Sequence, residues 1–284
     1  MNSIRTALIT GASSGIGAAL AEALAAPGVT LHLCGRDLGR LEAVAATCRG
    51  RAVVNATVLD VRDADAMAGW IRGVGRLDLV VANAGISGRS RDGGPENAEQ
   101  ARAIFEINLG GVLNTVLPAI AVMAEQTPGA DGLRGRIVAI ASLAAFMVSP
   151  DSAAYCASKA AVHRWMVASA PEARRRGVAL TSVCPGFVRT AMTAGYAFPM
   201  PGLMDADRAA RIILRGAAAG RRRVVFPWWM GLLARTAGLL PPRVMEAVAG
   251  QRPSGREQAH GGRTTLPACC CGRSHLCRHD RIRP

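Results

Sequence analysis

The first 25 residues predict a strand, a glycine-rich turn and a helix in direct succession. Residues 4–10 form a short apolar run, the turn contains Gly11, Gly15 and Gly17, and residues 18–25 are mostly alanine and leucine. Glycines let the backbone approach a phosphate, and the helix amino end offers free N–H groups and a positive dipole end. A glycine cluster by itself also occurs in ordinary turns. In this context it predicts an α/β fold that begins with a phosphate-binding turn.

The alternation of strand and helix continues along the chain. We expect strands near 4–10, 29–34, 52–59, 77–82, 135–141, 178–184 and 222–226, and helices near 15–26, 38–48, 63–73, 96–126, 152–176 and 205–219. The strands are short and almost continuously apolar, which is typical of a parallel sheet covered on both faces. The length and the 50% hydrophobic composition suffice for one large domain. We therefore predict a Rossmann-like, doubly wound parallel sheet in a single domain of residues 1–226.

Polar and glycine motifs follow the ends of four predicted strands. They begin at Gly11, Asn83, Ser142 and Pro185. Because ligands bind outside the carboxyl ends of parallel strands, these motifs are expected to meet at one edge of the sheet. Each also has a purely structural interpretation, since Ser142 and Asn83 are ordinary turn residues.

Lys159 is the only lysine in the chain, and it follows one of only two tyrosines, Tyr155, by four residues. Residues four apart are neighbours on a helix, and the segment 153–161 is a good helix former. An ammonium beside a phenol lowers the phenol pKa, so that it can exchange a proton near neutral pH. A tyrosine pKa of about 7 lies about three units below the usual value of about 10, which corresponds to ~4 kcal/mol. One positive charge at ~4 Å supplies about this energy at an effective dielectric of ~20. The alternative is a chance pair on a solvated helix face.

These motifs, taken in order from residue 1 to about 226, resemble the short-chain dehydrogenase/reductase family. The resemblance implies a nicotinamide-dependent oxidoreductase acting on carbonyl and alcohol groups. It implies four catalytic residues: Asn108, Ser142, Tyr155 and Lys159. The cofactor-binding residues that it implies are Thr10, Gly11, Ser13, Ser14, Gly15, Ile16, Gly17, Arg36, Asp60, Val61, Asn83, Ala84, Gly85, Tyr155, Lys159, Pro185, Gly186, Val188 and Thr190. Without the resemblance, Asn108 could face solvent and Asp60 could merely cap a helix.

The end of the second predicted strand indicates the cofactor. Enzymes that favour NAD usually place a carboxylate there to bind the ribose 2′-hydroxyl. This chain has Gly35 at the matching position, followed by Arg36, which can pair with a 2′-phosphate. Asp37 comes one position too late and is expected to cap the next helix. We therefore expect NADP rather than NAD.

The predicted substrate wall is apolar and rich in methionine, which suits a hydrophobic ketone or aldehyde, or the corresponding alcohol. Its candidate residues are Phe146, Met147, Val148, Phe187, Val188, Met192, Tyr196, Phe198, Met200, Leu203 and Met204. Pro171 is expected to kink or end the helix that follows Lys159, which in the family helps to build the interface of a homo-oligomer.

The carboxyl-terminal region departs from the family pattern. Residues 227–250 are expected to form an amphipathic helical extension, with Trp229, Leu232 and Leu233 on one face of a helix over 228–240. This helix is too short to span a bilayer, and no apolar run of about 20 residues is apparent elsewhere. It could dock on the domain, on a sister subunit or on a membrane surface.

Residues 251–284 contain seven arginines, four cysteines and three histidines, and they are expected to be disordered. The adjacent cysteines at 269–271 lack the spacing of a zinc finger, so we predict no metal site. The net charge of +14 suggests anionic partners, but no nucleic-acid-binding motif is present. Cys34, Cys48, Cys156 and Cys184 are expected to be free thiols in a cytoplasmic protein.

The sequence thus favours an NADP(H)-dependent oxidoreductase of small apolar carbonyl compounds. Two alternatives stay open. One is a regulator or scaffold that senses NADP(H) without turnover. The other is a lipid-linked carbonyl reductase held at a membrane surface by residues 228–240.

Overall fold

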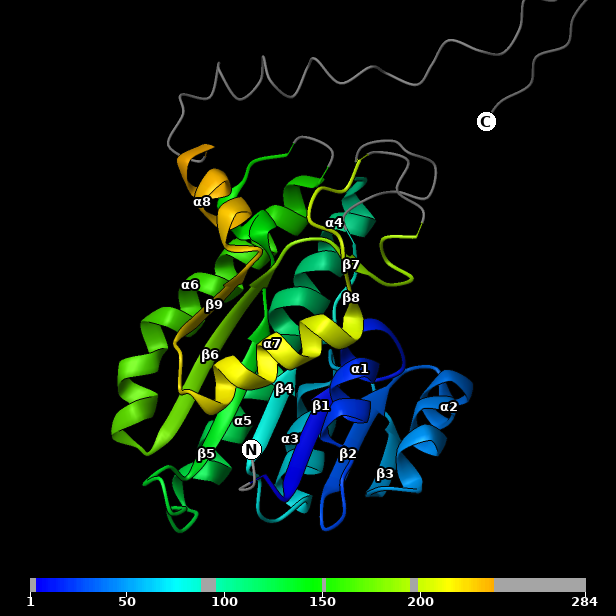
Figure 1. The fold of residues 1–284 in the computed structure, drawn as a ribbon, viewed down its shortest axis with the longest axis vertical. Coiled ribbons are helices and arrows are strands. Elements are labelled where there is room, and N and C mark those ends of the chain that lie inside the picture. Colours follow the sequence, from blue (N-terminus) through cyan, green and yellow to red (C-terminus); the bar gives the residue numbers. More distant parts are fainter. Residues whose placement is uncertain (1–3, 88–95, 150–151, 195–198, 238–284) are drawn as a thin grey trace, which may run out of the picture.

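A seven-stranded parallel sheet forms the centre of the computed structural model, which describes residues 4–87, 96–149, 152–194 and 199–237 (Figure 1). The strand order is β3-β2-β1-β4-β5-β6-β9. The strands are β1 (Thr6–Thr10), β2 (Thr30–Gly35), β3 (Val53–Val58), β4 (Leu79–Ala82), β5 (Gly135–Ile140), β6 (Val178–Pro185) and β9 (Arg223–Phe226). A separate pair, β7 (Val188–Arg189) and β8 (Met204–Asp205), lies in the connection from β6 to α7. The predicted Rossmann-like fold is confirmed.

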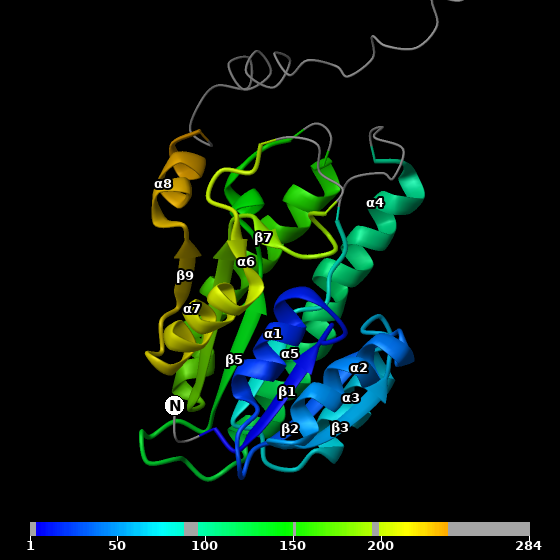
Figure 2. The same cartoon turned by 45° about the vertical axis from the view of Figure 1, so that its right-hand side comes forward.

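Helices cover both faces of the sheet (Figures 1 and 2). One face carries α1 (Gly15–Leu24), α2 (Leu38–Arg49) and α7 (Ala206–Ala218), which share one apolar core with the strands. The other carries α3 (Ala64–Gly73), α5 (Gly111–Ala124) and α6 (Ala153–Arg175) around a second core. The central strands β4, β5 and β6 are buried almost throughout, so their side chains do not alternate between polar and apolar, whereas the edge strand β3 is partly exposed.

The helix expected over 96–126 has an internal change of geometry. It consists of α4 (Ala98–Phe105), one π-helical turn (Glu106–Gly110) and α5. Together the 27 residues 98–124 are long and apolar enough to cross a membrane by length and composition alone, contrary to the sequence expectation, but half of the apolar window is buried in the protein. Such burial is typical of a core helix.

Pro171 does not end α6, which continues to Arg175, so the expectation of a helix end at this proline was wrong. One proline removes a single backbone donor near the end of a 23-residue helix, and the packed residues Ala170 and Ala173 flank it.

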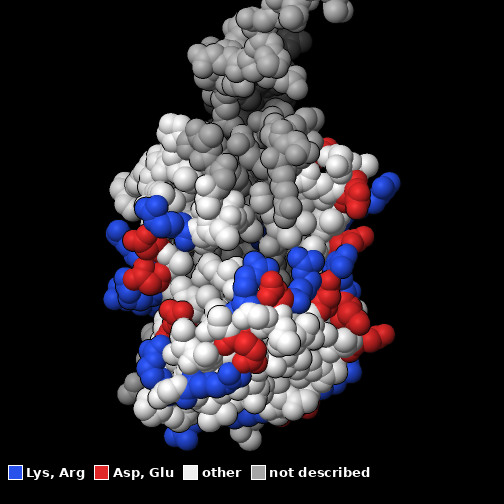
Figure 3. Space-filling view, turned by 90° about the vertical axis from the view of Figure 1, so that its right-hand side faces the viewer, with Lys and Arg blue, Asp and Glu red and all other residues white. Residues whose placement is uncertain are grey.

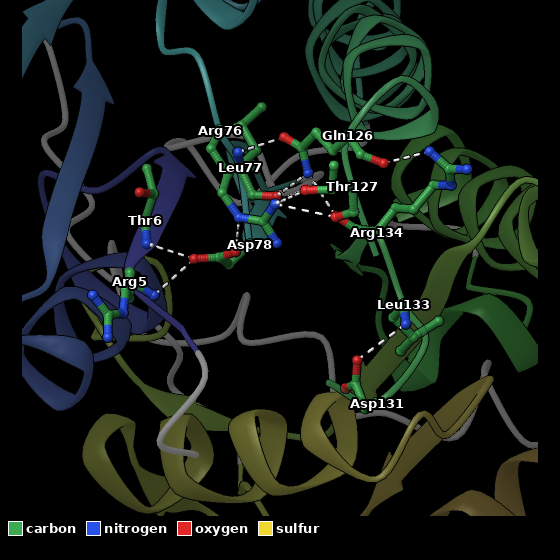
Figure 4. A network of polar contacts seen from close by, with 10 residues as sticks. All are labelled: Arg5, Thr6, Arg76, Leu77, Asp78, Gln126, Thr127, Asp131, Leu133 and Arg134. Atoms are coloured by element: carbon green, nitrogen blue, oxygen red, sulfur yellow. Dashed lines mark hydrogen bonds and ion pairs between the residues drawn. The ribbon is translucent and has the colours of Figure 1, made fainter. Parts of the chain in front are cut away.

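Polar side chains tie the amino ends of the strands together (Figure 4). The carboxylate of Asp78 accepts hydrogen bonds from the backbone N–H groups of Arg5 at 2.8 Å and Thr6 at 3.0 Å, and it pairs with Arg76 at 3.1 Å. The Gln126 side chain accepts from the Leu77 N–H at 2.6 Å and donates to the Leu77 carbonyl at 2.9 Å. This network lies at the edge of the sheet opposite the glycine turn that follows β1, and it anchors β1, β4 and β5.

Helix α8 (Trp228–Ala237) confirms part of the expected extension, while residues 238–284 lie outside the described residues. The helix packs on the domain, against β9 and the 3-10 turn η2 (Leu143–Phe146). It does so through its small residues Gly231 and Ala234, whereas Trp229, Leu232 and Leu233 stay exposed. The bulky face identified in the sequence is therefore not the face that docks on the domain.

Candidate active site

A cavity of about 720 Å³ lies at the carboxyl ends of the strands. It extends from the glycine turn after β1, past the ends of β2 to β6, to the loop before α7 and to helix α8. Most of the residues predicted to bind cofactor or to act in catalysis line it. Thr10, Gly17 and Asn108 are the exceptions, and they lie directly behind the lining.

The glycine turn brings backbone close to backbone. Gly11 has a φ of +64°, and a Cβ atom there would lie 2.8 Å from the Ala84 Cα. A Cβ at Gly17 would lie 2.3 Å from the carbonyl oxygen of Gly11. Side chains at these two positions would therefore force the turn to move. Gly15 has a φ of +58° and packs against Thr190.

The amino end of α1 is open to an anion. Its N-cap residue, Ser14, makes no side-chain capping hydrogen bond, and no acidic residue stands in the first turn. Free N–H groups and the helix dipole therefore face the cavity beside Ser13 and Ile16, which also line it. Val61, Ala84 and Gly85 form the adjoining wall.

Thr10 and Asn83 hold this turn in place through hydrogen bonds to the backbone. The Thr10 hydroxyl accepts hydrogen bonds from the N–H groups of Asn83 at 3.0 Å and Ala84 at 3.2 Å. The Asn83 amide donates to the carbonyl oxygens of Thr10 and Gly11, both at 3.0 Å. These bonds join the ends of β1 and β4.

The end of β2 presents an arginine to the cavity. Arg36 is exposed, lines the cavity and makes no hydrogen bond or ion pair among the described residues. Asp37 instead caps α2 through the Arg40 N–H at 2.9 Å, which confirms the expected cap. The Arg40 bonds lower the pKa of Asp37. At Gly35, a Cβ would meet Ser13 at 3.3 Å, so this strand end fits closely against the turn.

Asp60 follows β3 and lines the cavity without capping the next helix. Its carboxylate accepts from the Arg62 guanidinium at 2.8 Å and from the Arg62 N–H at 3.0 Å, and the side-chain bond is the main cause of its lowered pKa. Asp63 caps α3 instead, accepting from the Ala66 N–H at 2.9 Å. The capping alternative for Asp60 is thus wrong.

Ser142, Tyr155 and Lys159 come together at the centre of the cavity. The Ser142 Oγ accepts from the Ala144 N–H at 3.1 Å, so its own proton can point elsewhere. The Lys159 Nζ lies 5.8 Å from the centroid of the Tyr155 ring and donates to the Ile140 carbonyl at 2.9 Å. Two of the three ammonium protons are left for other acceptors. Burial lowers the pKa of Lys159 to about 8.

Asn108 lies in the π-helical turn and is completely buried, so it does not face solvent. Its Oδ1 accepts from the Ile86 N–H at 2.8 Å, and its Nδ2 donates to the Ile86 carbonyl at 3.1 Å. A Cβ at Gly85 would lie 3.0 Å from the Asn108 Oδ1 and 3.4 Å from the Lys159 Nζ. Gly85 therefore leaves space between these two groups that a side chain would fill.

Glu96 and His163 support α6, and sequence reasoning missed Glu96. Glu96 accepts hydrogen bonds from the N–H groups of Ala154 at 2.6 Å and Tyr155 at 3.3 Å, which fixes the start of α6. His163, one turn after Lys159, contacts the Ser182 hydroxyl at 2.9 Å and the Cys184 thiol at 3.3 Å. His163 is therefore a buried packing residue. No local motif identifies Glu96, which lies 58 residues before Ala154.

The segment after β6 closes the cavity opposite the glycine turn. Pro185, Gly186, Val188 and Thr190 all line it, and the Gly186 N–H donates to the Phe226 carbonyl at 2.7 Å. Among the described residues of the predicted substrate wall, those that line the cavity are Phe187, Met147 and Met192 as well as Val188. Tyr196 and Phe198 lie outside the described residues.

Within the described part of the chain, no group of three or more histidine, cysteine or acidic residues is arranged to hold a metal ion. The four predicted thiols, Cys34, Cys48, Cys156 and Cys184, are free and buried. Burial raises the pKa of Cys34 to about 12 and that of Cys184 to about 11. These cysteines are packing residues, because such thiols are poor nucleophiles.

Comparisons with known proteins agree with this site. Residues 5–197 match the family model for short chain dehydrogenases. An uncharacterized oxidoreductase of Myxococcus xanthus is 38% identical over 257 residues, covering 87% of this chain and 97% of the relative. A short-chain dehydrogenase from Sphingobium yanoikuyae, solved with NADPH, is 25% identical with a TM-score of 0.70, covering 91% of this chain and 99% of that one. Another short-chain dehydrogenase, from Mycobacterium paratuberculosis and bound to NAD, is 25% identical with a TM-score of 0.69, covering 80% of this chain and 98% of that one.

The chain therefore belongs to the short-chain dehydrogenase family. It is an oxidoreductase of the class that uses a nicotinamide cofactor to interconvert alcohols and carbonyl compounds.

Proposed function

We propose that this protein is an NADP(H)-dependent reductase of apolar ketones or aldehydes, acting reversibly on the corresponding alcohols. One observation carries the proposal. A single cavity joins the open amino end of α1, the exposed Arg36, the Ser142–Tyr155–Lys159 group and a wall of methionine and leucine side chains.

The residues present fit an NADP(H) molecule. The amino end of α1 suits the pyrophosphate, because it has free N–H groups and no acidic side chain in its first turn. Arg36 suits the 2′-phosphate, because it is exposed at the cavity and unpaired among the described residues. Lys159 has donors left for the nicotinamide ribose. The solved neighbours bind NADPH in one case and NAD in another, so the preference for NADP rests on Arg36 and Gly35.

The bound nicotinamide would supply or accept a hydride at the substrate carbon. During reduction, the Tyr155 hydroxyl donates its proton to the carbonyl oxygen. The Ser142 hydroxyl donates a hydrogen bond to the same oxygen and stabilises the negative charge that develops there. The ammonium of Lys159 favours the tyrosinate that is left, because an opposite charge nearby stabilises the ionised phenol.

Proton return to Tyr155 passes through Lys159 and a water molecule near Asn108 in this proposal. It is supported by the space at Gly85 between the Asn108 Oδ1 and the Lys159 Nζ. The buried amide of Asn108 is fixed by its two bonds to Ile86. With a pKa of about 8, Lys159 can gain and lose a proton near neutral pH.

The sensing alternative is less well supported than the enzyme. A protein that only sensed NADP(H) would need the phosphate end of the cavity and not a serine, tyrosine and lysine around the reacting carbon. One measurement distinguishes the enzyme from the sensor, because a sensor would bind NADPH without oxidising it.

A second candidate function places the same reductase at a membrane surface. The observation that favours it is Trp228, which is 75% exposed at the start of α8. Tryptophan is enriched where proteins meet the membrane interface. Flotation with anionic liposomes tests this candidate: Trp228→Ala should reduce flotation of the full-length protein, and a wild-type protein that does not float would exclude it.

The test of the main proposal is oxidation of NADPH by the purified full chain with a panel of aldehydes, ketones and charged sugars. We expect turnover with the apolar carbonyl compounds and little or none with the sugars. NADPH binding without turnover of any carbonyl compound would favour the sensor instead.

We further propose a cytoplasmic homo-oligomer, supported by the four free thiols and by the uninterrupted α6. Light scattering coupled to gel filtration measures the oligomeric state, and cell fractionation measures the location.

A further inference from the structure

Helix α8 is fixed against the domain by small residues. A Cβ at Gly231 would lie 2.4 Å from the Val225 side chain, so this turn of the helix touches β9 directly. Ala234, three residues on, is 5% exposed. The Arg235 guanidinium lies over the Phe146 ring, 4.9 Å from its centroid, and joins the helix to η2. The position of α8 at the cavity mouth is therefore set by packing on both neighbours.

This docking directs two α8 side chains into the cavity. Met230 and Leu233 both line it, whereas Leu232, next in sequence to Leu233, does not. The sulfur of Met230 would lie 3.3 Å from a Cβ at Gly202, so the helix also contacts the loop before β8. The family model ends at residue 197, before α8, and the wall that α8 forms is thus additional to the matched segment.

The cavity reaches the surface along apolar side chains from three separate segments. Met147, Met192 and Leu233 line the cavity and are nevertheless 41%, 41% and 62% exposed. Among the described lining residues, the charged ones are Lys159 at the centre and Arg36, Asp37, Arg40 and Asp60 at the cofactor end. Most of the charged side chains in Figure 3 lie across the middle and lower parts of the described surface.

We infer that the substrate carries a long, uncharged apolar chain that leaves the site between α8 and the Met192 loop, with Leu233 and Met230 as the residues that select it. This inference rests on the proposed function. A short carbonyl compound would leave the three rim side chains in water, whereas a chain that reaches them removes apolar surface from water on both partners. Methionine adapts to such chains, because it is unbranched and flexible.

The test is a series of straight-chain aldehydes from four to twelve carbons, with kcat/KM measured for wild type, Leu233→Ala and Leu232→Ala. Burial of one methylene corresponds to about fourfold in kcat/KM, so the wild-type value should rise by about that factor per carbon until the chain passes the rim. Leu233→Ala should lower kcat/KM for decanal about tenfold and leave butanal within about twofold.

Leu232→Ala is the matched control, because Leu232 is 59% exposed on the same helix but does not line the cavity. It should keep the wild-type profile for every aldehyde. Equal profiles for the two leucine variants, or a wild-type profile that does not depend on chain length, would overturn the inference. Both leucines are exposed, and unchanged NADPH dissociation constants would show that both variants are folded.

Calorimetric binding of the matching alcohols to the protein with NADPH, a combination that cannot react, gives a second readout. Affinity should rise with chain length in wild type and rise less in Leu233→Ala. If no aldehyde is turned over, the proposed reaction fails, but this titration still decides whether α8 selects long apolar chains. Affinity that is independent of chain length would contradict the inference alone.

Discussion

The two edges of the parallel sheet use polar side chains in opposite ways. At the amino edge, the side-chain oxygens of Asp78 and Gln126 accept hydrogen bonds from backbone N–H groups at the starts of the strands (Figure 4). At the carboxyl edge, Arg36 has no partner among the described residues, and Ser142 and Lys159 keep protons that no described residue accepts.

This difference separates the polar groups that stabilise the fold from those that are available to bind ligands. Paired groups at the amino edge contribute to folding, because an unsatisfied buried donor costs about 1–3 kcal/mol. Groups left unpaired at the carboxyl edge contribute little to folding and are available to ligands. Substitutions at the two edges should therefore affect different measurements.

The largest effect is expected for Tyr155→Phe. The ring is kept and only the proton donor is lost, so kcat should fall by about 10² to 10⁴, the range for acid–base catalysis. The melting temperature and the NADPH dissociation constant should stay close to wild type. These are measured by initial rates, thermal unfolding and fluorescence titration. A variant that retained the full rate would remove Tyr155 from the mechanism.

At the opposite edge, Asp78→Ala should lower the free energy of unfolding by about 2–4 kcal/mol, since it leaves the N–H groups of Arg5 and Thr6 without their acceptor. The kcat of the folded fraction should stay within about threefold of wild type. Urea unfolding and initial rates check the two halves of this prediction. Glu22→Ala, an exposed position in α1, should change stability by less than ~0.5 kcal/mol. Equal losses in the two variants would contradict a special role of Asp78.

Arg36→Ala should erase most of the preference for NADPH over NADH. A charge-assisted bond to the 2′-phosphate is worth about 1.5–3 kcal/mol, or roughly ten- to a hundredfold in affinity. Binding of NADH should hardly change. Fluorescence titration at fixed ionic strength measures all four dissociation constants.

Arg51→Ala is the matched control for Arg36, because it removes the same charge from an exposed residue that does not line the cavity. A wild-type protein that binds NADH as tightly as NADPH would show that Arg36 does not select the cofactor.

The smallest effect is expected for His163. Burial lowers its pKa to about 4, and the charges of Arg223, Arg235 and Arg164 act in the same direction. Between about pH 6.5 and pH 4 the unfolded chain therefore holds a proton that the folded protein lacks, so stability contributed by the neutral ring is lost as pH falls through this window. The loss should be on the order of 1–2 kcal/mol.

His163→Asn keeps an amide near Ser182 and does not titrate, so this part of the pH dependence should disappear. Urea unfolding at pH 7 and pH 5 measures it. An unchanged difference between the two pH values would assign the effect to other groups.

Much of the fold could be predicted from the sequence because each strand is a short apolar run bounded by turn residues. The strands β1 and β2 begin and end within two residues of the expected positions. The motifs at Gly11, Asn83, Ser142 and Pro185 meet at one cavity, as parallel strands require.

Other features depend on distant contacts, for which the local sequence gives no signal. The π-helical turn that buries Asn108 changes the direction of a side chain within an uninterrupted helical pattern. Glu96 caps α6 across a large sequence separation. Helix α8 docks through Gly231 and Ala234, whose small size allows close packing, while its leucines and tryptophans stay exposed.

The most direct test of the reaction uses NADPH carrying deuterium at either of the two hydrogens on carbon 4 of the nicotinamide. Wild-type protein is mixed with decanal and each labelled cofactor in turn, and the molecular mass of the product is measured by mass spectrometry. Direct hydride transfer in this cavity predicts decanol with one deuterium on its first carbon from one of the two cofactors and none from the other. Unlabelled decanol from both, or no decanol at all, would contradict it.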